Sequence, residues 1–240
     1  MLAASEFTVN NRRQPEPSPS ESTPPRVLSI LSSVIEKLVA RNDRLVDSSD
    51  QKLFGTTTSS LALLGKGLNA FHGVRAPNIT VLKYLERLYK YANCSPACFV
   101  VGYVYIDRMV HKYPDSLVVS LNVHRLLITS VMIASKMLDD VHYNNAFYAR
   151  IGGVSNAELN RLEIEFLFLL DFGVMVSSRA FESYCMHLEK EMLLNGAVHK
   201  IERPLLRSEL QHHDNTSATP PEENKKILHQ LKPLTDLLIN

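Results

Sequence analysis

Two oppositely charged side chains, Lys136 and Glu163, interrupt patterns that are otherwise apolar and helical. A lysine near the end of an enclosed helix is costly to bury, so its ammonium group must reach water or an acceptor. Glu163 follows the core position Leu162, at the rim of a second apolar stripe. If the two helices are neighbours, the pair either forms a surface ion pair worth about 0 to 1 kcal/mol or presents one donor and one acceptor to another protein's backbone. Residue chemistry alone favours the surface ion pair.

The other candidates for catalysis or metal binding have unsuitable spacing. Gly152-Gly153 lacks the following Lys-Ser/Thr of a phosphate-binding loop and instead indicates a helix break. His212-His213 lies in a polar stretch, and neither His-x-x-x-His nor Cys-x-x-Cys occurs. For Asp139-Asp140, a solvated helix end is favoured over a metal or acid–base pair. The sequence therefore predicts no enzyme, no cofactor, no metal site and no small-molecule substrate.

Composition argues against several further classes of protein. A net charge of +1 on 240 residues gives no basic excess for nucleic-acid binding. The three cysteines, Cys94, Cys98 and Cys185, indicate no disulfide framework and a reducing compartment, nuclear or cytoplasmic. Residues 1–21 lack the apolar run of a signal peptide, and the longest apolar run, 97–106, is far below the roughly 18 residues of a membrane span. We expect a soluble intracellular protein with no membrane partner.

Apolar periodicity predicts helices that would position Lys136 and Glu163. The β-branched and aromatic content of 97–112 would also suit a buried strand, but its length favours a helix. The stretch 123–138 is apolar around most of its circumference, so it should be surrounded by other helices. No strand–turn–strand signal occurs, and the predicted fold class is all-α. The predicted helices span 26–46, 78–92, 97–112, 123–138, 145–151, 155–171 and 178–194.

The remaining stretches are polar and predict little regular structure. Residues 1–25 are rich in Pro, Ser and Glu and predict a disordered tail. Ser18-Pro19 and Thr23-Pro24 within it suit a proline-directed kinase, although a solubilising role is favoured. The predicted organisation is a tail over 1–25, an N-terminal helix and loop over 26–77, a five-helix unit over 78–172, a C-terminal helix over 173–195, and a mostly flexible tail over 196–240 with a short helix at 227–231.

Three motifs follow one another in the chain: YIDRMV at 105–110, HRLLITSVMIASKMLDD at 124–140 and GGVSNAELNRLEIEFLFLLDF at 152–172. In this order they resemble the cyclin box. The spacing and the continuation MLDDVHYNN are most similar to the plant U-type, or P-type, cyclins and the fungal phosphate-response cyclins. The resemblance implies a single five-helix box over 78–172, flanked by one helix on each side, with motif residues Asp107, Arg108, Ser155 and Glu158. Ser155 and Glu158 also have the spacing of a helix capping box.

The resemblance also implies a role for the two charges. Lys136 falls on the lysine of the Ala-Ser-Lys motif and Glu163 on the glutamate of the fifth helix. In cyclins these residues grip the backbone just before the kinase helix that carries the catalytic-site glutamate. The implied function is activation of a cyclin-dependent protein kinase in cell division or phosphate-linked signalling. The alternatives are a cyclin-fold transcription factor, disfavoured by near-neutral charge and the absence of a zinc ribbon, and an adaptor that activates no kinase.

Two positions depart from the pattern of many cyclins. An ungapped count back from Asp107 places Asn78 and Tyr84 where those cyclins have an arginine, which pairs with the aspartate, and a tryptophan, which builds a substrate-docking groove. Neither the arginine pair nor that style of groove is therefore expected in this chain. Asp107 is instead expected to cap or brace a neighbouring helix.

Overall fold

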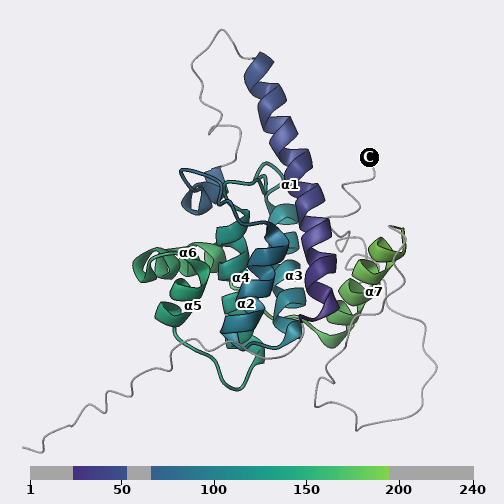
Figure 1. Ribbon diagram of the computed structural model, residues 1–240, viewed down its shortest axis with the longest axis vertical. Coiled ribbons are helices and arrows are strands. Elements are labelled where there is room, and N and C mark those ends of the chain that lie inside the picture. The colour runs from purple at the N-terminus through teal and green to yellow at the C-terminus, as the bar shows by residue number, and fades with distance from the viewer. Residues whose placement is uncertain (1–23, 53–65, 195–240) are drawn as a thin grey trace, which may run out of the picture.

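The computed structural model describes residues 24–52 and 66–194, and every regular element in these ranges is a helix (Figure 1). The predicted all-α class is confirmed. The expectations for residues 1–23, 53–65 and 195–240, including the short helix at 227–231, lie outside the described residues. The elements are α1 (Arg26–Lys52), the 3-10 helix η2 (Lys66–Phe71), α2 (Val81–Ala92), α3 (Pro96–Lys112), α4 (Val123–Leu138), α5 (Asn145–Gly152), α6 (Asn156–Leu169) and α7 (Ser178–Leu194).

Helix α4 is the centre of the fold, as its all-round apolar pattern predicted. Twelve of its sixteen residues are buried, and it packs against α2, α3, α5, α6 and η2. Four of the buried residues are polar, and the hydroxyls of two of them, Thr129 and Ser130, are satisfied within the helix. Thr129 Oγ1 donates to the Arg125 carbonyl at 2.7 Å, and Ser130 Oγ donates to the Leu127 carbonyl at 3.2 Å. Burial of this helix therefore leaves neither hydroxyl without a partner.

Helix α3 crosses α4 closely at Gly102. A Cβ atom at this position would lie 3.2 Å from both Ser130 Oγ and Val131 Cγ2, which is tighter than ordinary van der Waals contact. Most of α3 is buried, including three of its four valines and both of its tyrosines. Tertiary packing therefore outweighs the strand propensity of these residues, and length gives the correct helical interpretation.

Helix α1 is longer than its apolar pattern predicted, because it continues from the expected end at Val46 to Lys52. Its first half is buried against the bundle, and Asn42 Nδ2 donates to the Val118 carbonyl at 2.8 Å. The C-terminal part extends beyond the other helices (Figure 1). Apolar periodicity reports only where a helix meets a core. It therefore misses a polar continuation such as 47–52, which contains neither proline nor glycine.

Helix α2 begins at Val81, so the start at Asn78 that the sequence predicts is wrong. Thr80 is the N-cap, and its hydroxyl accepts a hydrogen bond from the Lys83 N–H at 3.3 Å. The reason lies in tertiary contact: the Ile79 carbonyl is hydrogen-bonded to His124 Nε2 at 3.0 Å. That bond ties the carbonyl to α4, so the segment before Thr80 stays outside the helix.

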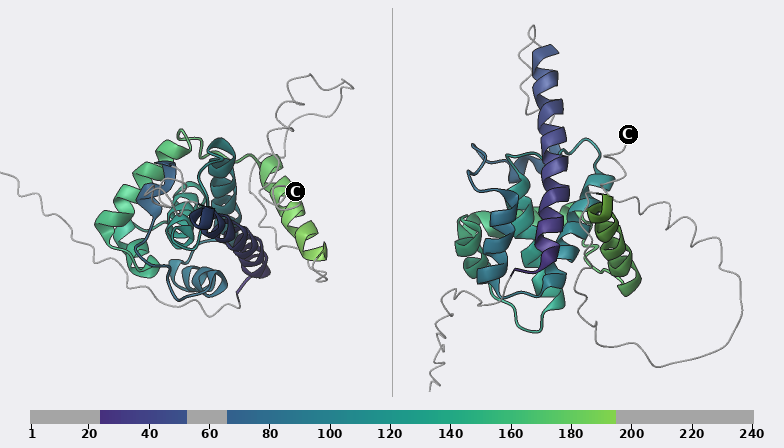
Figure 2. Two further views of the ribbon diagram at one scale, coloured as in Figure 1. Left: turned by 90° about the horizontal axis from the view of Figure 1, so that it is seen from above. Right: turned by 45° about the vertical axis from the view of Figure 1, so that its right-hand side comes forward.

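Two further elements frame the bundle. The long connection predicted over 48–76 contains η2, whose Leu68 and Phe71 are fully buried, and the Phe71 ring meets Phe166 of α6 edge-on. Helix α7 lies against α1 and α3, on the side of the bundle away from α5 and α6 (Figures 1 and 2). Within 24–52 and 66–194, no helix has the length and hydropathy needed to cross a bilayer.

Candidate protein-interaction site

The structure brings the two singled-out charges together at the surface between α4 and α6. Lys136 Nζ lies 2.6 Å from Glu163 Oε1, and the side chains are 27% and 19% exposed, respectively. Partial burial weakens the competition from water while leaving the outer faces of both groups accessible. The pair is therefore better shielded than an ordinary surface ion pair.

Asn145, at the start of α5, closes this ion pair into a ring. Its Oδ1 accepts from Lys136 Nζ at 2.6 Å, and its Nδ2 donates to Glu163 Oε2 at 2.6 Å. The same Nδ2 donates to Asn160 Oδ1 at 2.8 Å. We call Lys136, Asn145, Asn160 and Glu163 the polar cluster. Helices α4, α5 and α6 each contribute to it, so its geometry depends on the packing of all three.

The polar cluster retains hydrogen-bonding capacity. A lysine ammonium group has three donors, and Lys136 uses two of them on Asn145 and Glu163. Each carboxylate oxygen of Glu163 accepts one of these bonds and has further acceptor capacity. The cluster can therefore offer a charged donor and a charged acceptor to a partner's backbone carbonyl and N–H.

A second network fixes the end of α4 that carries Lys136. Asp139, the C-cap residue, accepts at its Oδ2 from Ser135 Oγ at 3.0 Å, from the Ser95 N–H at 3.3 Å and from Cys98 Sγ at 3.3 Å. Tyr148 Oη donates to Ser135 Oγ at 2.8 Å, and burial raises the pKa of the tyrosine so that the phenol keeps its proton. Asp139 is therefore tied to the bundle, in contrast to the solvated helix end predicted for it, whereas Asp140 is exposed.

Exposed apolar side chains are carried by α4 and α6, the helices that also carry Lys136 and Glu163. Among the described residues, seven of the ten exposed large hydrophobic side chains lie at the end of α4, on α6 or in the segments just after them. Large apolar groups gathered on one face commonly mark a protein interface. We call the four carried by α4 and α6 the apolar rim; they are Met137, Leu138, Ile164 and Phe168.

The motif residues Asp107 and Arg108 lie away from the polar cluster and hold the chain after α6. Asp107 is buried and accepts from Tyr184 Oη of α7 at 2.6 Å, so it braces a neighbouring helix. Burial, followed by the charge of Asp107 and the hydrogen bond to it, raises the pKa of Tyr184. Arg108 Nη1 donates to the carbonyls of Gly173 and Met175, both at 2.9 Å.

Ser155 and Glu158 act at the start of α6. The Glu158 N–H donates to Ser155 Oγ at 3.1 Å, which is the backbone half of the predicted capping box. The Glu158 side chain instead pairs with Arg125 of α4, with Nε and Oε1 2.6 Å apart. The carboxylate therefore links α6 to the central helix.

Several residues of these networks are not predicted from the sequence, among them Asn145, Asn160 and Tyr184. Asn160 precedes Glu163 by three positions on α6, a spacing that places both on one helix face and could have been noticed. Asn145 and Tyr184 gave no such signal, because their partners lie on other helices. In the described ranges, no cluster of His, Cys, Asp and Glu side chains could hold a metal ion.

A model of the cyclin family matches residues 25–174, which is more than half of the chain. The chain belongs to the cyclin family. The match includes every residue of the polar cluster and the apolar rim. Cyclins are regulatory proteins without catalytic activity, and they typically partner with cyclin-dependent kinases.

The similarity to plant U-type and P-type cyclins is confirmed. The chain is 66% identical over 181 residues to Cyclin-U1-1 of Arabidopsis thaliana, covering 75% of this chain and 80% of that protein. It is 42% identical over 199 residues to Cyclin-U4-1 of the same plant, covering 83% and 96%. It is also 49% identical over 172 residues to Cyclin-P1-1 of Oryza sativa subsp. japonica, covering 70% and 63%.

Proposed function

We propose that this cyclin binds and activates a cyclin-dependent protein kinase through the polar cluster and the apolar rim. The observation that supports this most strongly is the closed ring of Lys136, Asn145 and Glu163, set at the surface beside exposed apolar side chains. Its remaining donor and acceptor capacity suits the backbone of an incoming segment. The cyclin itself catalyses nothing.

The two parts of this surface have different tasks. The apolar rim loses contact with water on binding and contributes most of the affinity. The polar cluster fixes the register of the partner's backbone, because Lys136 donates to a carbonyl and Glu163 accepts from an N–H only where both groups lie at matching positions. Binding energy that is available only in the active arrangement of the kinase shifts the kinase population toward that arrangement. The proposed process is cell division or phosphate-linked signalling.

Charge reversal tests this surface. Lys136→Glu and Glu163→Arg each place two like charges together in the polar cluster. Each also removes either the charged donor or the charged acceptor that would bind the partner's backbone. Each variant is expected to lose kinase co-purification from the source cells while its helical circular dichroism is retained. An Asp47→Arg change, on the exposed part of α1, is the matched control and should leave binding unchanged. Unchanged binding in both Lys136→Glu and Glu163→Arg would refute the proposed surface.

Kinase activity assays separate the proposal from its alternatives. An activator should raise the phosphorylation of a peptide or histone substrate by the purified partner kinase. Binding without a gain in activity would indicate an adaptor. A gel shift with duplex DNA at moderate salt, together with no kinase in the purified complex, would indicate a transcription-factor role instead.

A further inference from the structure

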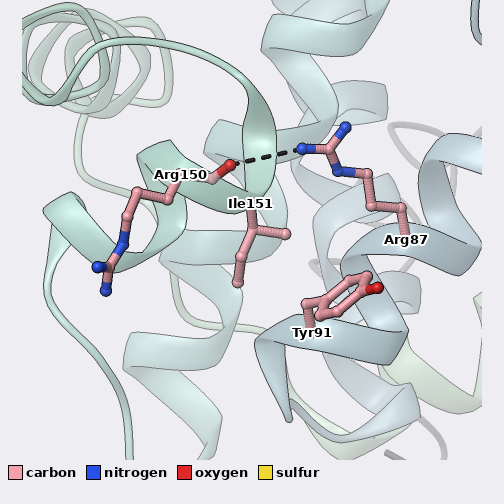
Figure 3. A pocket seen from close by; sticks show the side chains of 4 residues that line it. All are labelled: Arg87, Tyr91, Arg150 and Ile151. Atoms are coloured by element: carbon pink, nitrogen blue, oxygen red, sulfur yellow. Dashed lines mark hydrogen bonds between the residues drawn. The ribbon is translucent and has the colours of Figure 1, made fainter. Parts of the chain in front are cut away.

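A cavity lies between α2 and α5, outside the proposed kinase-binding surface. It has a volume of about 360 Å³ and is lined by Arg87, Tyr91, Arg150 and Ile151 (Figure 3). This volume is at the lower end of the range for small-ligand pockets, roughly 300 to 1,000 Å³, and suits a single side chain. We call it the arginine pocket.

Two guanidinium groups, those of Arg87 and Arg150, belong to the residues that line the arginine pocket. In Figure 3 they lie on opposite sides of Ile151, which forms an apolar wall together with the Tyr91 ring. Arg87 Nη2 donates to the Arg150 carbonyl at 3.5 Å, so one of its five N–H donors is committed to α5. Guanidinium groups recognise phosphate and carboxylate oxygens through paired, charge-assisted hydrogen bonds.

The surroundings reinforce this charge. Helix α2 carries Lys83 and Lys90 beside Arg87, with Glu86 as its single acidic residue, and α5 carries no acidic residue. Lys90 Nζ lies 5.5 Å from the centroid of the Tyr91 ring. The whole chain has a net charge of only +1, so this concentration of positive charge is local. It is suited to an anionic ligand.

We propose that the arginine pocket binds the chain's own N-terminal segment when Ser18 is phosphorylated. Residues 14–24, QPEPSPSESTP, contain Glu16 and Glu21 and no basic residue, so their charge is complementary to the pocket. Phosphorylation transfers the γ-phosphoryl group of ATP to Ser18 Oγ, releasing ADP and a proton. It adds about −1.5 to −2 charges and three acceptor oxygens near pH 7. The proline that follows Ser18 suits a proline-directed kinase. The inference rests on the proposed function only in that the bound partner kinase could supply this step.

The segment is long enough to reach the pocket. Helix α1 starts at the end of the bundle at which α2 finishes, and α1 and α2 pack together (Figure 1). Ser18 lies six positions before Pro24, which gives an extended reach of about 20 Å, whereas a helix with its side chains is about 10 to 12 Å across. The extended segment from Ser18 to Pro24 is therefore longer than α2 is wide. Thr23 directly precedes Pro24, so a phosphate at position 23 cannot reach the arginine pocket. Position 23 therefore serves as an internal reference for the phosphate at position 18.

Attachment to the same chain makes even a weak site effective. A short tether gives an effective concentration on the order of 1 mM. With an intrinsic dissociation constant of about 0.1 mM, the docked state would exceed the undocked state about tenfold. A docked phosphate is inaccessible to other enzymes.

Phosphatase protection tests the proposal on the full chain. Phosphoserine at 18 and phosphothreonine at 23 are installed during synthesis, and the removal of each by a non-specific phosphatase is timed. Phosphoserine 18 should be removed about tenfold more slowly in the native chain than in the Arg87→Gln/Arg150→Gln double variant. Removal from position 23 should be equal in both. Arg161→Gln, an exposed arginine of α6, is the matched control and should keep the protection.

A second measurement keeps the test decisive if the double variant is unstable. Hydrogen exchange of the native chain should slow in α2 and α5 when Ser18 alone is phosphorylated. Equal phosphatase rates and unchanged exchange would overturn the proposal. An added phosphopeptide that needs Arg87 for binding, while phosphoserine 18 stays unprotected, would assign the pocket to a partner and also overturn it. Because the phosphate is installed chemically, failure of kinase binding would not affect these results.

Discussion

The phenol of Tyr184 donates a 2.6 Å hydrogen bond to the carboxylate of Asp107, which is only 2% exposed. This bond joins α7 to α3, and a T-shaped contact between the Tyr184 and Tyr103 rings lies beside it. Tyr184→Phe keeps the ring but removes a donor to a buried charge, so the free energy of unfolding should fall by about 1.5 to 3 kcal/mol. Urea denaturation measures this change.

A conservative tyrosine variant controls for loss of the hydroxyl itself. Tyr143→Phe keeps the stacking of Tyr143 on Phe147, with ring centroids 3.9 Å apart, and should change stability by less than about 0.5 kcal/mol. If both variants lost equal stability, Tyr184 would have no special role in holding α7.

Asn145→Ala tests whether the polar cluster depends on its third member. The change removes hydrogen bonds to Lys136, Glu163 and Asn160, so the two charged side chains lose their fixed geometry. Kinase affinity should fall about tenfold in a titration calorimetry experiment, with helical circular dichroism retained. Asn160→Ala removes only the outer bond and should weaken binding by less than about twofold. Equal losses in the two variants would contradict the assigned role of Asn145.

Phe168→Ala tests the apolar rim. The side chain is 60% exposed and touches the ring of Phe172 edge-on, so its removal should affect binding far more than folding. Kinase affinity should fall about tenfold or more, with a faster dissociation rate in surface plasmon resonance. Met186→Ala is a close control, because its side chain is 57% exposed and it belongs to α7, which lies on the side of the bundle away from α6. An equal effect at Met186 would place the interface elsewhere.

His124 should make folding sensitive to acid. Burial, with a smaller effect from Arg125, lowers its pKa, while its bond to the Ile79 carbonyl acts in the opposite direction; its buried Nδ1 has no hydrogen-bond partner. Below the unfolded-state pKa of about 6.5, the unfolded chain binds more protons than the folded one, so the free energy of unfolding decreases as the pH is lowered. Above that value the contribution is complete. His124→Gln should reduce the stability difference between pH 7.5 and 5.5 by up to about 1 kcal/mol.

Denaturation at the two pH values checks this prediction. The exposed His142→Gln is the control and should keep the native difference. Part of the remaining dependence should come from His72, whose pKa is also lowered by burial. A His124→Gln protein with the full native pH dependence would disprove the assignment.

The sequence predicts the helices best where the local pattern and the tertiary environment agree. The bounds of 123–138 are correct because its apolar residues face neighbours on every side. The start of α2 is wrong because Asn78 and Thr80 are both suitable caps, and the bond from His124 to the Ile79 carbonyl decides between them. A local pattern contains no information about that distant contact.

The same limit applies to the candidate site. Lys136 and Glu163 were recognisable as charges on apolar helices, and adjacency of those helices was enough to suggest a pair. Their closure by Asn145 depends on how α5 is rotated against α4 and α6, which no spacing rule specifies. The bond between Asp107 and Tyr184 spans 77 residues of sequence and joins two helices whose contact is set by the whole bundle.

The ring formed by Lys136, Asn145 and Glu163 is complete in the isolated chain, which has a consequence for association. Ordering a long polar side chain at an interface costs about 0.5 to 1.5 kcal/mol. Here that conformational entropy is lost during folding, before any partner arrives. The surface is therefore preorganised, so in the proposed complex the structural adjustment on binding would fall mainly on the kinase.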